Sequence, residues 1–222
     1  MPANPPDDRP IQPAATEPQW LQWAREIQAI AQTGLAYTPG SKFDVERYQR
    51  LRAIATEMLA AHGNLDPDVM LSLFEREEGY ATPKVDVRGA VFKDGKLLMV
   101  QETSDGKWAP PGGWADVNDT PSEAVTREIW EESGYETRAT KIIAVCDRTI
   151  QGHQPFLPFH VYKLFIQCEL IGGEPKVSIE TQKVDFFSED ELPELSPSRV
   201  NLSQIHRLFN HYRQPELLTY FD

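Results

Sequence analysis

The chain contains 222 residues, of which 40% are hydrophobic, and it carries a formal net charge of −12. This length is enough to bury one large core together with a smaller satellite domain. The acidic balance argues against a nucleic-acid partner, because proteins that bind a phosphate backbone gather Lys and Arg on one basic face. No apolar run approaches the length of a membrane span, and the first residues lack the apolar stretch of a signal peptide. The sequence therefore predicts a cytoplasmic protein without a membrane partner.

The cysteines give no sign of a metal site. Cys146 and Cys168 both fall in segments that read as strands, and their spacing is not that of metal ligands. We expect both to be buried core thiols. An acidic protein can still bind a phosphate compound when divalent cations lie between the two sets of negative charge.

The N-terminal part of the chain predicts a tail followed by a small all-α domain. The segment 1–17 is rich in proline and has almost nothing apolar to bury, so we expect a flexible tail. Residues 18–80 then show helical spacing of apolar side chains. The apolar residues of the first predicted helix are expected to share one face: Trp20, Trp23, Ala24, Ile27, Ile30 and Ala31.

Two more helices complete this domain. One follows Asp44 and ends at Gly63, and the other begins at the capping residue Asp66 and stops near Gly79. A bundle of three short helices rarely buries enough apolar surface to be stable alone. It should pack either on the rest of the chain or on a second subunit, and we favour the second arrangement, which predicts a homodimer.

Alternating apolar residues begin after Pro83 and predict strands. Val85, Val87, Gly89 and Val91 are expected on one face of the first strand. Asp94-Gly95 is a strong hairpin signal before a returning strand. The remaining elements are expected as strands at 96–100, 141–149, 159–170 and 183–187, and as helices at 188–191 and 199–212. Residues 81–222 therefore predict a single α/β domain.

The segment between the hairpin and the later strands predicts a glycine-rich loop followed by a helix. Thr120 and Glu123 form a capping box, and Gly134 suits the left-handed position after the last turn. Glu128, Glu131 and Glu132 fall on one face of this helix. Glutamate-rich helix surfaces are common, so this pattern alone favours an ordinary solvated face.

The loop in front of the helix changes that interpretation. Gly112 and Gly113 allow the backbone to approach the carboxylates closely, so carbonyl oxygens can complete a metal site. Oxygen ligands alone select Mg²⁺, Mn²⁺ or Ca²⁺ over zinc.

This segment resembles the signature of the Nudix hydrolase family, G-x5-E-x7-R-E-U-x-E-E-x-G-U, in which U is bulky and apolar. The matching residues are Gly113, Arg127, Glu128, Ile129, Glu131, Glu132, Gly134 and Tyr135. One position departs, because Asp119 stands where the family has a glutamate. The resemblance extends over residues 18–212 and includes a subgroup with a helical dimerisation domain.

The resemblance implies the Nudix fold, a mixed β-sheet between helices in an α/β/α sandwich. It also implies hydrolysis of a nucleoside diphosphate linked to another group X, with CDP-choline or ADP-ribose as the expected substrate. The expected cofactor is Mg²⁺, with Mn²⁺ as a substitute. Its expected ligands are Glu128, Glu131, Glu132 and a carbonyl of Gly112 or Gly113.

Other residues receive expected roles in catalysis. Arg127 is expected to orient a neighbouring glutamate, although a surface ion pair is the simpler interpretation. The general base is either a glutamate of the signature helix, Glu128 or Glu131, or Glu180 in a later loop.

Substrate contacts are expected near the glycine-rich loop. Arg88 is a candidate for the diphosphate or the X group, with a structural ion pair as the alternative. Trp114 and Asp116 are further candidates for substrate binding, whereas Trp108 is expected to pack in the core. The long loop 147–159, which holds His153, is expected to shape a substrate pocket or a dimer contact.

Two other classes of function fit parts of the sequence. A nucleotide sensor without catalytic activity could use the same fold, but it usually lacks signature carboxylates or carries a DNA-binding domain, and neither is evident. A protein-interaction module would use the N-terminal helices as its working part. A metal-dependent activity assay separates both alternatives from the enzyme.

Overall fold

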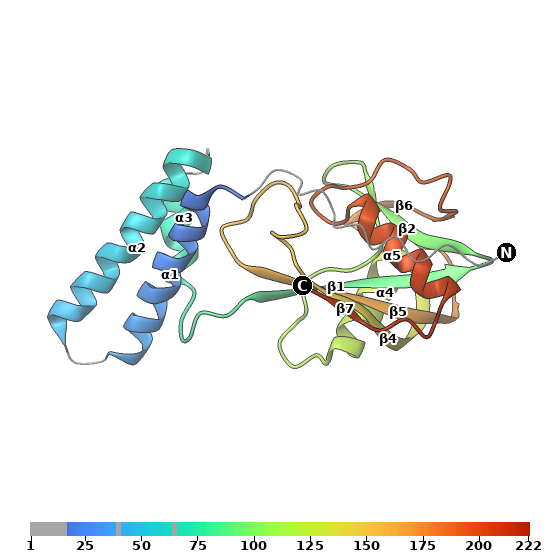
Figure 1. Ribbon diagram of the computed structural model, residues 1–222, viewed down its shortest axis with the longest axis horizontal. Helices are drawn as coiled ribbons and strands as arrows, with labels where there is room; N and C mark the ends of the chain where they lie inside the picture. Colours follow the sequence, from blue (N-terminus) through green and yellow to red (C-terminus); the bar gives the residue numbers. More distant parts are fainter. Residues whose placement is uncertain (1–16, 39–40, 64–65) are drawn as a thin grey trace. The chain divides into compact units, whose positions relative to one another are not determined.

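The computed structural model describes all residues except 1–16, 39–40 and 64–65, and it divides into two compact units (Figure 1). A helical unit extends to Lys84 and also includes Phe156–His160. A second unit, here called the catalytic unit, contains Val85–Pro155 and Val161–Asp222. Nearly all of the predicted flexible tail lies outside the described residues. None of the helices in the described ranges is long and apolar enough to cross a membrane.

The helical unit consists of α1 (Gln19–Tyr37), α2 (Lys42–Gly63) and α3 (Pro67–Glu75) (Figure 1). The start of α3 is as predicted, because the Asp66 side chain accepts hydrogen bonds from the first turn. Its predicted end was wrong: α3 stops at Glu75, four residues before Gly79. The start of α2 also differs, because Ser41 Oγ accepts from the Asp44 amide at 3.2 Å. Ser41, rather than Asp44, therefore caps this helix.

The buried face of α1 differs from the predicted one. Ala24 and Ala31 are buried as expected, but Trp23 and Ile30 are 53% and 51% exposed. The residues that α1 buries are Leu21, Ala24, Gln28, Ala31 and Gln32. Gly34 explains the rotation, because a Cβ there would lie 2.3 Å from the ring of Tyr48 in α2. Small residues thus bring α1 and α2 together, and the larger apolar side chains remain outside.

The core of the helical unit includes residues from far along the chain. Leu21, Leu59 and Phe74 are buried together, and Phe156 and Phe159 pack against them. The rings of Phe74 and Phe159 meet edge to face at 6.0 Å. This part of the 147–159 loop supplies apolar surface to the core of the helical unit. The predicted role of the loop in a substrate pocket or a dimer contact stays a prediction.

The catalytic unit is built on a seven-stranded sheet in which strands β3, β2, β1, β5, β4 and β7 follow one another and β6 pairs with β2. The strands are β1 (Lys84–Lys93), β2 (Lys96–Glu102), β3 (Trp108–Ala109), β4 (Tyr135–Asp147), β5 (Val161–Gly173), β6 (Thr181–Phe187) and β7 (Tyr220–Phe221). Asp94 and Gly95 have φ values of 51° and 76°, as a two-residue hairpin requires. The short strands β3 and β7 had not been predicted, and β4 begins at Tyr135 rather than Lys141. Ser188–Glu191 forms a turn instead of the predicted helix.

Two helices, α4 (Pro121–Ser133) and α5 (Leu202–Arg213), cover opposite faces of the sheet (Figure 1). Val87 and Val91 of β1 pack with Ile129 of α4, on the face that the alternating pattern predicts. The other face of the same strand presents Ala90 to the cluster that contains Leu208 of α5. The α/β/α sandwich is confirmed. Both cysteines are buried and free, as expected of core thiols.

Candidate active site

The signature segment has the local structure that its sequence predicts. Thr120 and Glu123 form both hydrogen bonds of a capping box at the start of α4. Gly134 ends the helix in the left-handed conformation, with φ of 77°. The helix is therefore fixed at both ends by side chains and backbone within the segment itself.

The glycine-rich loop runs alongside β1. Gly113 O accepts a hydrogen bond from the Val87 amide, and Pro111 O accepts one from Gly89, both at 2.8 Å. Gly112 has φ of 145°, and a Cβ there would lie 2.0 Å from Val87 O. Only glycine fits at this position, so the loop can lie against the strand at the start of the candidate site.

Two glutamates of α4 border this loop. Glu132 is 5% exposed, and its Oε2 accepts a hydrogen bond from the Gly112 amide at 2.8 Å. Glu128 lies beside Gly113, because a Cβ added there would be 2.8 Å from Glu128 Oε2. Burial raises the pKa of Glu132 to about 8, and the neighbouring charges of Glu102 and Glu128 add to this effect. The site thus concentrates negative charge in a place with little water.

Arg127 lies at the centre of the more exposed carboxylates. Its Nη1 donates to Glu128 Oε1 at 2.8 Å and to Glu131 Oε2 at 3.2 Å. Its Nε donates to Asp119 Oδ2 at 3.0 Å, and Nη2 pairs with Asp116 at 3.3 Å. Asp119 therefore holds Arg127 in this structure, and Arg127 holds the two glutamates. These ion pairs fit both the orienting role and the simpler surface ion pair, so the orienting role stays a prediction.

Glu102 is a residue of this site that the sequence analysis missed. It is the last residue of β2, is 2% exposed, and forms an ion pair with Arg199. Glu102 pairs with Thr181 across β2 and β6, and the Thr181 hydroxyl donates to Glu132 O at 2.8 Å. The only sequence signal for Glu102 is an acidic residue at the end of a strand that leads into the glycine-rich loop.

Glu180 precedes β6 and is placed at the same edge of the sheet. Its carbonyl accepts a hydrogen bond from the Thr103 amide at 2.8 Å, while its side chain is exposed. The charge of Glu180 contributes to the raised pKa of Glu102, after the larger effect of burial. The structure therefore brings Glu180 close to Glu102 at the end of β2.

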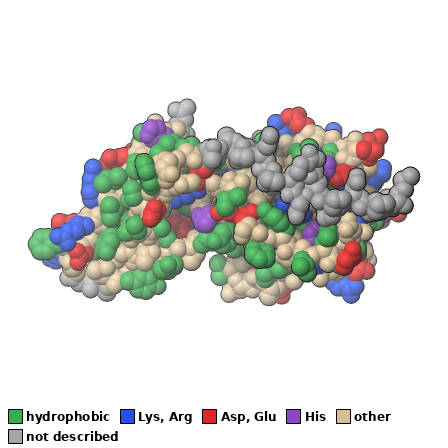
Figure 2. Space-filling model, viewed as in Figure 1, with side chains coloured by type: hydrophobic (Ala, Val, Ile, Leu, Met, Phe, Trp, Pro, Cys, Tyr) green, Lys and Arg blue, Asp and Glu red, His purple; other side chains and the backbone are tan. Residues whose placement is uncertain are grey.

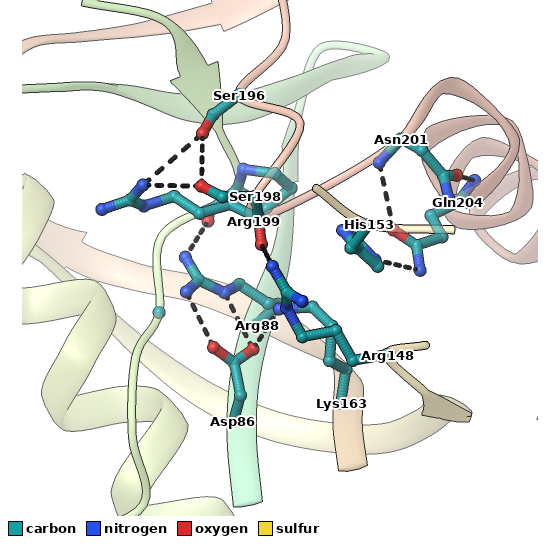
Figure 3. A network of polar contacts seen from close by, with 12 residues as sticks. Asp86, Arg88, Arg148, His153, Lys163, Ser196, Ser198, Arg199, Asn201 and Gln204 are labelled. Carbon is teal, nitrogen blue, oxygen red and sulfur yellow. Dashed lines mark hydrogen bonds and ion pairs between the residues drawn. The ribbon is translucent and has the colours of Figure 1, made fainter. Parts of the chain in front are cut away.

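Arg88 lies in a buried network of charged residues (Figure 3). Its Nε and Nη2 donate to the two oxygens of Asp86 at 3.0 and 2.9 Å, and Lys163 Nζ donates to Asp86 Oδ1 at 2.6 Å. Although burial alone would raise it, the two cations hold the pKa of Asp86 well below its usual range. The guanidinium of Arg88 is 5% exposed. The ion pair, which was the alternative to substrate binding, describes Arg88 in this structure.

The other candidate residues from the sequence analysis differ in how far they are exposed to solvent. Trp114 is 47% exposed and forms an isolated bridge with Asp86, while the side chain of Asp116 is 72% exposed. Trp108 packs on the core, with its ring 4.8 Å from that of Phe187, as predicted. His153 is 1% exposed, and its Nδ1 lies 3.2 Å from Pro197 O, so it serves to fix its loop rather than to line a pocket.

The residues present suit a divalent cation. Among the described residues, no three Asp, Glu, His or Cys side chains already surround a single point at metal-ligand spacing. The donors nevertheless have the right chemistry, because Glu128 and Glu132 are hard oxygen ligands on one side of the Gly112–Gly113 loop. Burial raises the pKa of both groups, and a nearby cation would favour their charged forms.

Sequence comparisons identify both units. A family model described as NUDIX domain matches residues 82–209. A second model, described as UDP-X-like, N-terminal oligomerisation domain, matches residues 18–74. Together they cover most of the residues that the structure describes.

Individual relatives extend over most of the chain. YjhB of Bacillus subtilis (strain 168), whose name gives ADP-ribose pyrophosphatase as an unproven activity, is 44% identical over 92% of this chain and 97% of its own length. The crystal structure of a UDP-X diphosphatase is 32% identical, covers 91% of this chain and 98% of its own, and has a TM-score of 0.59. An ADP-ribose pyrophosphatase from Streptococcus suis 89-1591 is 36% identical, covers 64% of this chain and all of its own, and has a TM-score of 0.57.

Proposed function

This chain belongs to the Nudix hydrolase family, and we propose that it hydrolyses ADP-ribose with Mg²⁺ to give AMP and ribose 5-phosphate. It is an enzyme that cleaves phosphorus-containing anhydrides. Members of this family generally use divalent metal ions. The names of three relatives support ADP-ribose as the substrate: the B. subtilis protein, the S. suis enzyme and an ADP-ribose pyrophosphatase of Methanocaldococcus jannaschii.

One observation carries the chemistry. Glu128 and Glu132 border the Gly112–Gly113 loop, and Arg127 links Glu128 to Glu131 on the outer side. A buried set of carboxylates repels an anionic diphosphate unless a cation lies between them. The same set becomes favourable for binding when Mg²⁺ is present, because Mg²⁺ prefers oxygen ligands.

We assign the metal-ligand roles to Glu128, Glu131 and Glu132, together with the carbonyl of Gly112. When bound, Mg²⁺ would polarise the diphosphate oxygens and lower the pKa of a water molecule. Of the two glycine carbonyls considered, that of Gly113 already accepts from Val87, which favours Gly112. Arg127 keeps Glu128 and Glu131 in place through its two hydrogen bonds.

We propose Glu180 as the general base. Its backbone is held by Thr103, whereas its carboxylate is exposed beside the buried group of Glu102. A base in this position can take a proton from water because its carboxylate is not one of the proposed metal ligands. Replacement by glutamine should lower kcat with little change in KM, whereas replacement of a metal ligand should also raise the Mg²⁺ concentration needed for half activity.

Trp114 and Asp116 are the proposed substrate-binding residues. Trp114 is half exposed beside the glycine-rich loop, which makes its ring available for stacking on the adenine base. Asp116 lies next to Arg127 with most of its carboxylate in solvent, where it can accept hydrogen bonds from ribose hydroxyls. Trp114→Ala should therefore raise KM for ADP-ribose and leave kcat largely unchanged.

A substrate panel tests the proposal. Hydrolysis of ADP-ribose, CDP-choline and a UDP-linked sugar is measured with Mg²⁺, with Mn²⁺ and with EDTA, and the products are identified by chromatography. We expect the highest kcat/KM for ADP-ribose and no turnover with EDTA. If kcat/KM is higher for the UDP-linked sugar, the substrate assignment must change from ADP-ribose to that compound. If kcat/KM is highest for a nucleoside triphosphate, the proposed reaction is contradicted.

We also propose that the helical unit forms a homodimer. Trp23, Ile30 and Tyr37 are spaced seven residues apart along α1 and are 53%, 51% and 68% exposed. Such a stripe is the pattern of a helix that packs against another helix. Figure 2 shows apolar side chains gathered over the surface of the helical unit. Light scattering of the full chain should give twice the mass of one chain, and a single-chain mass would contradict the proposal.

A further inference from the structure

Glu102 is buried beside the metal-ligand set without being part of its helix. Its cross-strand partner Thr181 is hydrogen-bonded to the last turn of α4 at Glu132 O. The charge of Glu102 adds to the raised pKa of Glu132, so the two carboxylates are close enough to interact. A fourth carboxylate at this position could compete with the helix glutamates for a cation.

Arg199 is the ion-pair partner of Glu102. Its Nε forms an ion pair with Glu102 Oε1, and its Nη1 donates to Ser198 Oγ at 3.1 Å and to Ser196 Oγ at 3.5 Å (Figure 3). These serines hold the guanidinium at a nitrogen other than the one that faces Glu102. Arg199 is thereby fixed at both ends of its fork.

The segment that carries Arg199 is itself anchored on two sides. The Ser196 amide donates to Trp108 O at 2.8 Å, and its hydroxyl donates to Asp105 Oδ2 at 2.7 Å. On the other side, the Gln154 amide donates to Pro197 O at 3.2 Å, and the buried His153 ring contacts the same carbonyl. The backbone therefore leaves little freedom in where the Arg199 side chain begins.

A purely stabilising role explains this pair poorly. Taking a carboxylate out of water is costly, and apolar residues of similar volume often stabilise a fold equally well. Glu102 is 2% exposed, and its surroundings contain more charge, since Arg88 also acts on it and on Glu132.

We propose that Arg199 is a positioning residue, whose ion pair keeps Glu102 out of the metal-ligand set that its cross-strand partner Thr181 contacts at Glu132 O. The inference rests on the proposed metal-dependent function of the site. It assigns Arg199 no contact with substrate. When the pair is broken, the released Glu102 carboxylate can turn toward the cation and occupy a position that water or the diphosphate needs.

The test compares full-length wild type with Arg199→Gln, Glu102→Gln and the double variant. Mn²⁺ binding to the substrate-free proteins is measured by electron paramagnetic resonance. We expect Arg199→Gln to tighten Mn²⁺ binding at least about threefold and the double variant to bind as Glu102→Gln does. At saturating Mn²⁺, kcat of Arg199→Gln should fall about tenfold while KM changes less than about twofold.

Three results would overturn the proposal. The first is additive effects of the two substitutions on Mn²⁺ binding, because additivity means that the residues are not coupled. The second is a higher KM with unchanged Mn²⁺ binding, which would place Arg199 on the substrate. The third is a lower melting temperature alone, which would make the pair structural.

A conservative variant keeps the test usable if Arg199→Gln does not fold. Arg199→Lys retains the positive charge and should bind Mn²⁺ within about twofold of wild type, whereas a larger change would contradict the proposal. The Mn²⁺ measurement needs no substrate. Failure of wild type to hydrolyse any nucleoside diphosphate compound would therefore refute the proposed function and leave the coupling of Arg199 to Glu102 to be decided separately.

Discussion

The two units of this protein contain energetically unfavourable groups of opposite kinds. The catalytic unit buries charge: Glu102, Glu132 and Lys163 are 2%, 5% and 1% exposed. The helical unit leaves apolar surface in solvent, with Trp23 and Ile30 about half exposed. Neither arrangement favours an isolated, unliganded chain, since buried charge needs compensation and exposed apolar surface needs cover.

The difference shows what each unit lacks. The buried carboxylates around α4 have fewer cations beside them than charges to balance, and a divalent metal ion would supply the missing positive charge. The exposed stripe on α1 is mostly apolar and carries no charge, so it is covered best by another apolar helix face. A substitution in one unit should therefore change metal dependence, and a substitution in the other should change the oligomeric state.

The largest expected effect comes from a metal ligand. Glu132→Gln keeps the shape of the side chain and an oxygen for the Gly112 amide, but it removes a charged ligand. We expect kcat/KM for ADP-ribose to fall about 100-fold or more with the oligomeric state unchanged. Glu169→Gln, which removes an exposed charge paired with Arg138, is the matched control and should retain activity. Near wild-type turnover of Glu132→Gln at saturating Mg²⁺ would remove this residue from the site.

The corresponding change in the helical unit is Trp23→Lys. A lysine in the middle of the exposed stripe places a charge in an apolar interface, so the variant should be largely monomeric in light scattering. Ile30→Lys should act in the same direction. Leu218→Lys replaces a side chain that is 90% exposed in the catalytic unit and controls for the added charge. If both α1 variants are still dimers, the dimer interface must lie on another surface.

A pH series sharpens the comparison without substrate. Burial raises the pKa of Glu132 from the ordinary glutamate value of 4.5 to about 8, so the folded protein holds this proton more tightly than the unfolded chain. The stability that this proton provides is present below pH 4.5 and is lost as pH rises toward 8. Glutamine cannot lose a proton. Between pH 5 and 8, the free energy of unfolding of metal-free Glu132→Gln should therefore rise relative to that of wild type by on the order of 3 kcal/mol.

Urea unfolding in EDTA at several pH values measures this gain. Glu169→Gln again serves as the control for removing one negative charge. A stability difference that stays constant from pH 5 to pH 8 would show that Glu132 is not desolvated in the metal-free protein. Adding Mg²⁺ should reduce or reverse the advantage of the variant, because metal binding stabilises the charged wild-type site.

The elements that the sequence predicted best are those with local causes. The loop and helix of the signature segment depend on glycine conformation and on a capping box formed by Thr120 and Glu123. The two faces of β1 follow from strand alternation alone. In each case the residues that decide the structure are within a few positions of one another.

The elements that escaped prediction depend on partners far along the chain. The face of α1 is decided by the close approach of Gly34 to Tyr48, which the apolar pattern does not contain. Glu102 is identified as a site residue only by its contacts with Thr181 and Arg199, which lie many positions later in the chain. Phe156 and Phe159 pack in the core of a unit whose helices lie in the segment that ends at Lys84, far before them in the chain. None of these contacts produces a sequence periodicity.

The smallest expected effect concerns Asp119, where the family signature has a longer glutamate. Asp119 Oδ2 lies 3.0 Å from Arg127 Nε, and the same guanidinium holds Glu128 and Glu131. The aspartate thus acts on the metal-ligand set through Arg127. Asp119→Ala should lower kcat/KM several-fold, about 1 kcal/mol in the barrier, because Arg127 keeps its other carboxylate partners.

Asp119→Glu provides the matched comparison, since it restores the family residue and keeps the charge. If Asp119 only orients Arg127, the longer side chain gains nothing, and its kcat/KM should lie at or slightly below that of wild type. Arg127→Lys should lose at least as much as Asp119→Ala, because it also weakens the contacts to Glu128 and Glu131. The two substitutions combined should cost less than their sum, because both interrupt the contact between Asp119 and Arg127. A loss from Asp119→Ala larger than that from Glu128→Gln would instead make Asp119 a direct ligand. In that case the loop would have to place the shorter side chain of Asp119 near enough to the metal ion to bind it, without the help of Arg127.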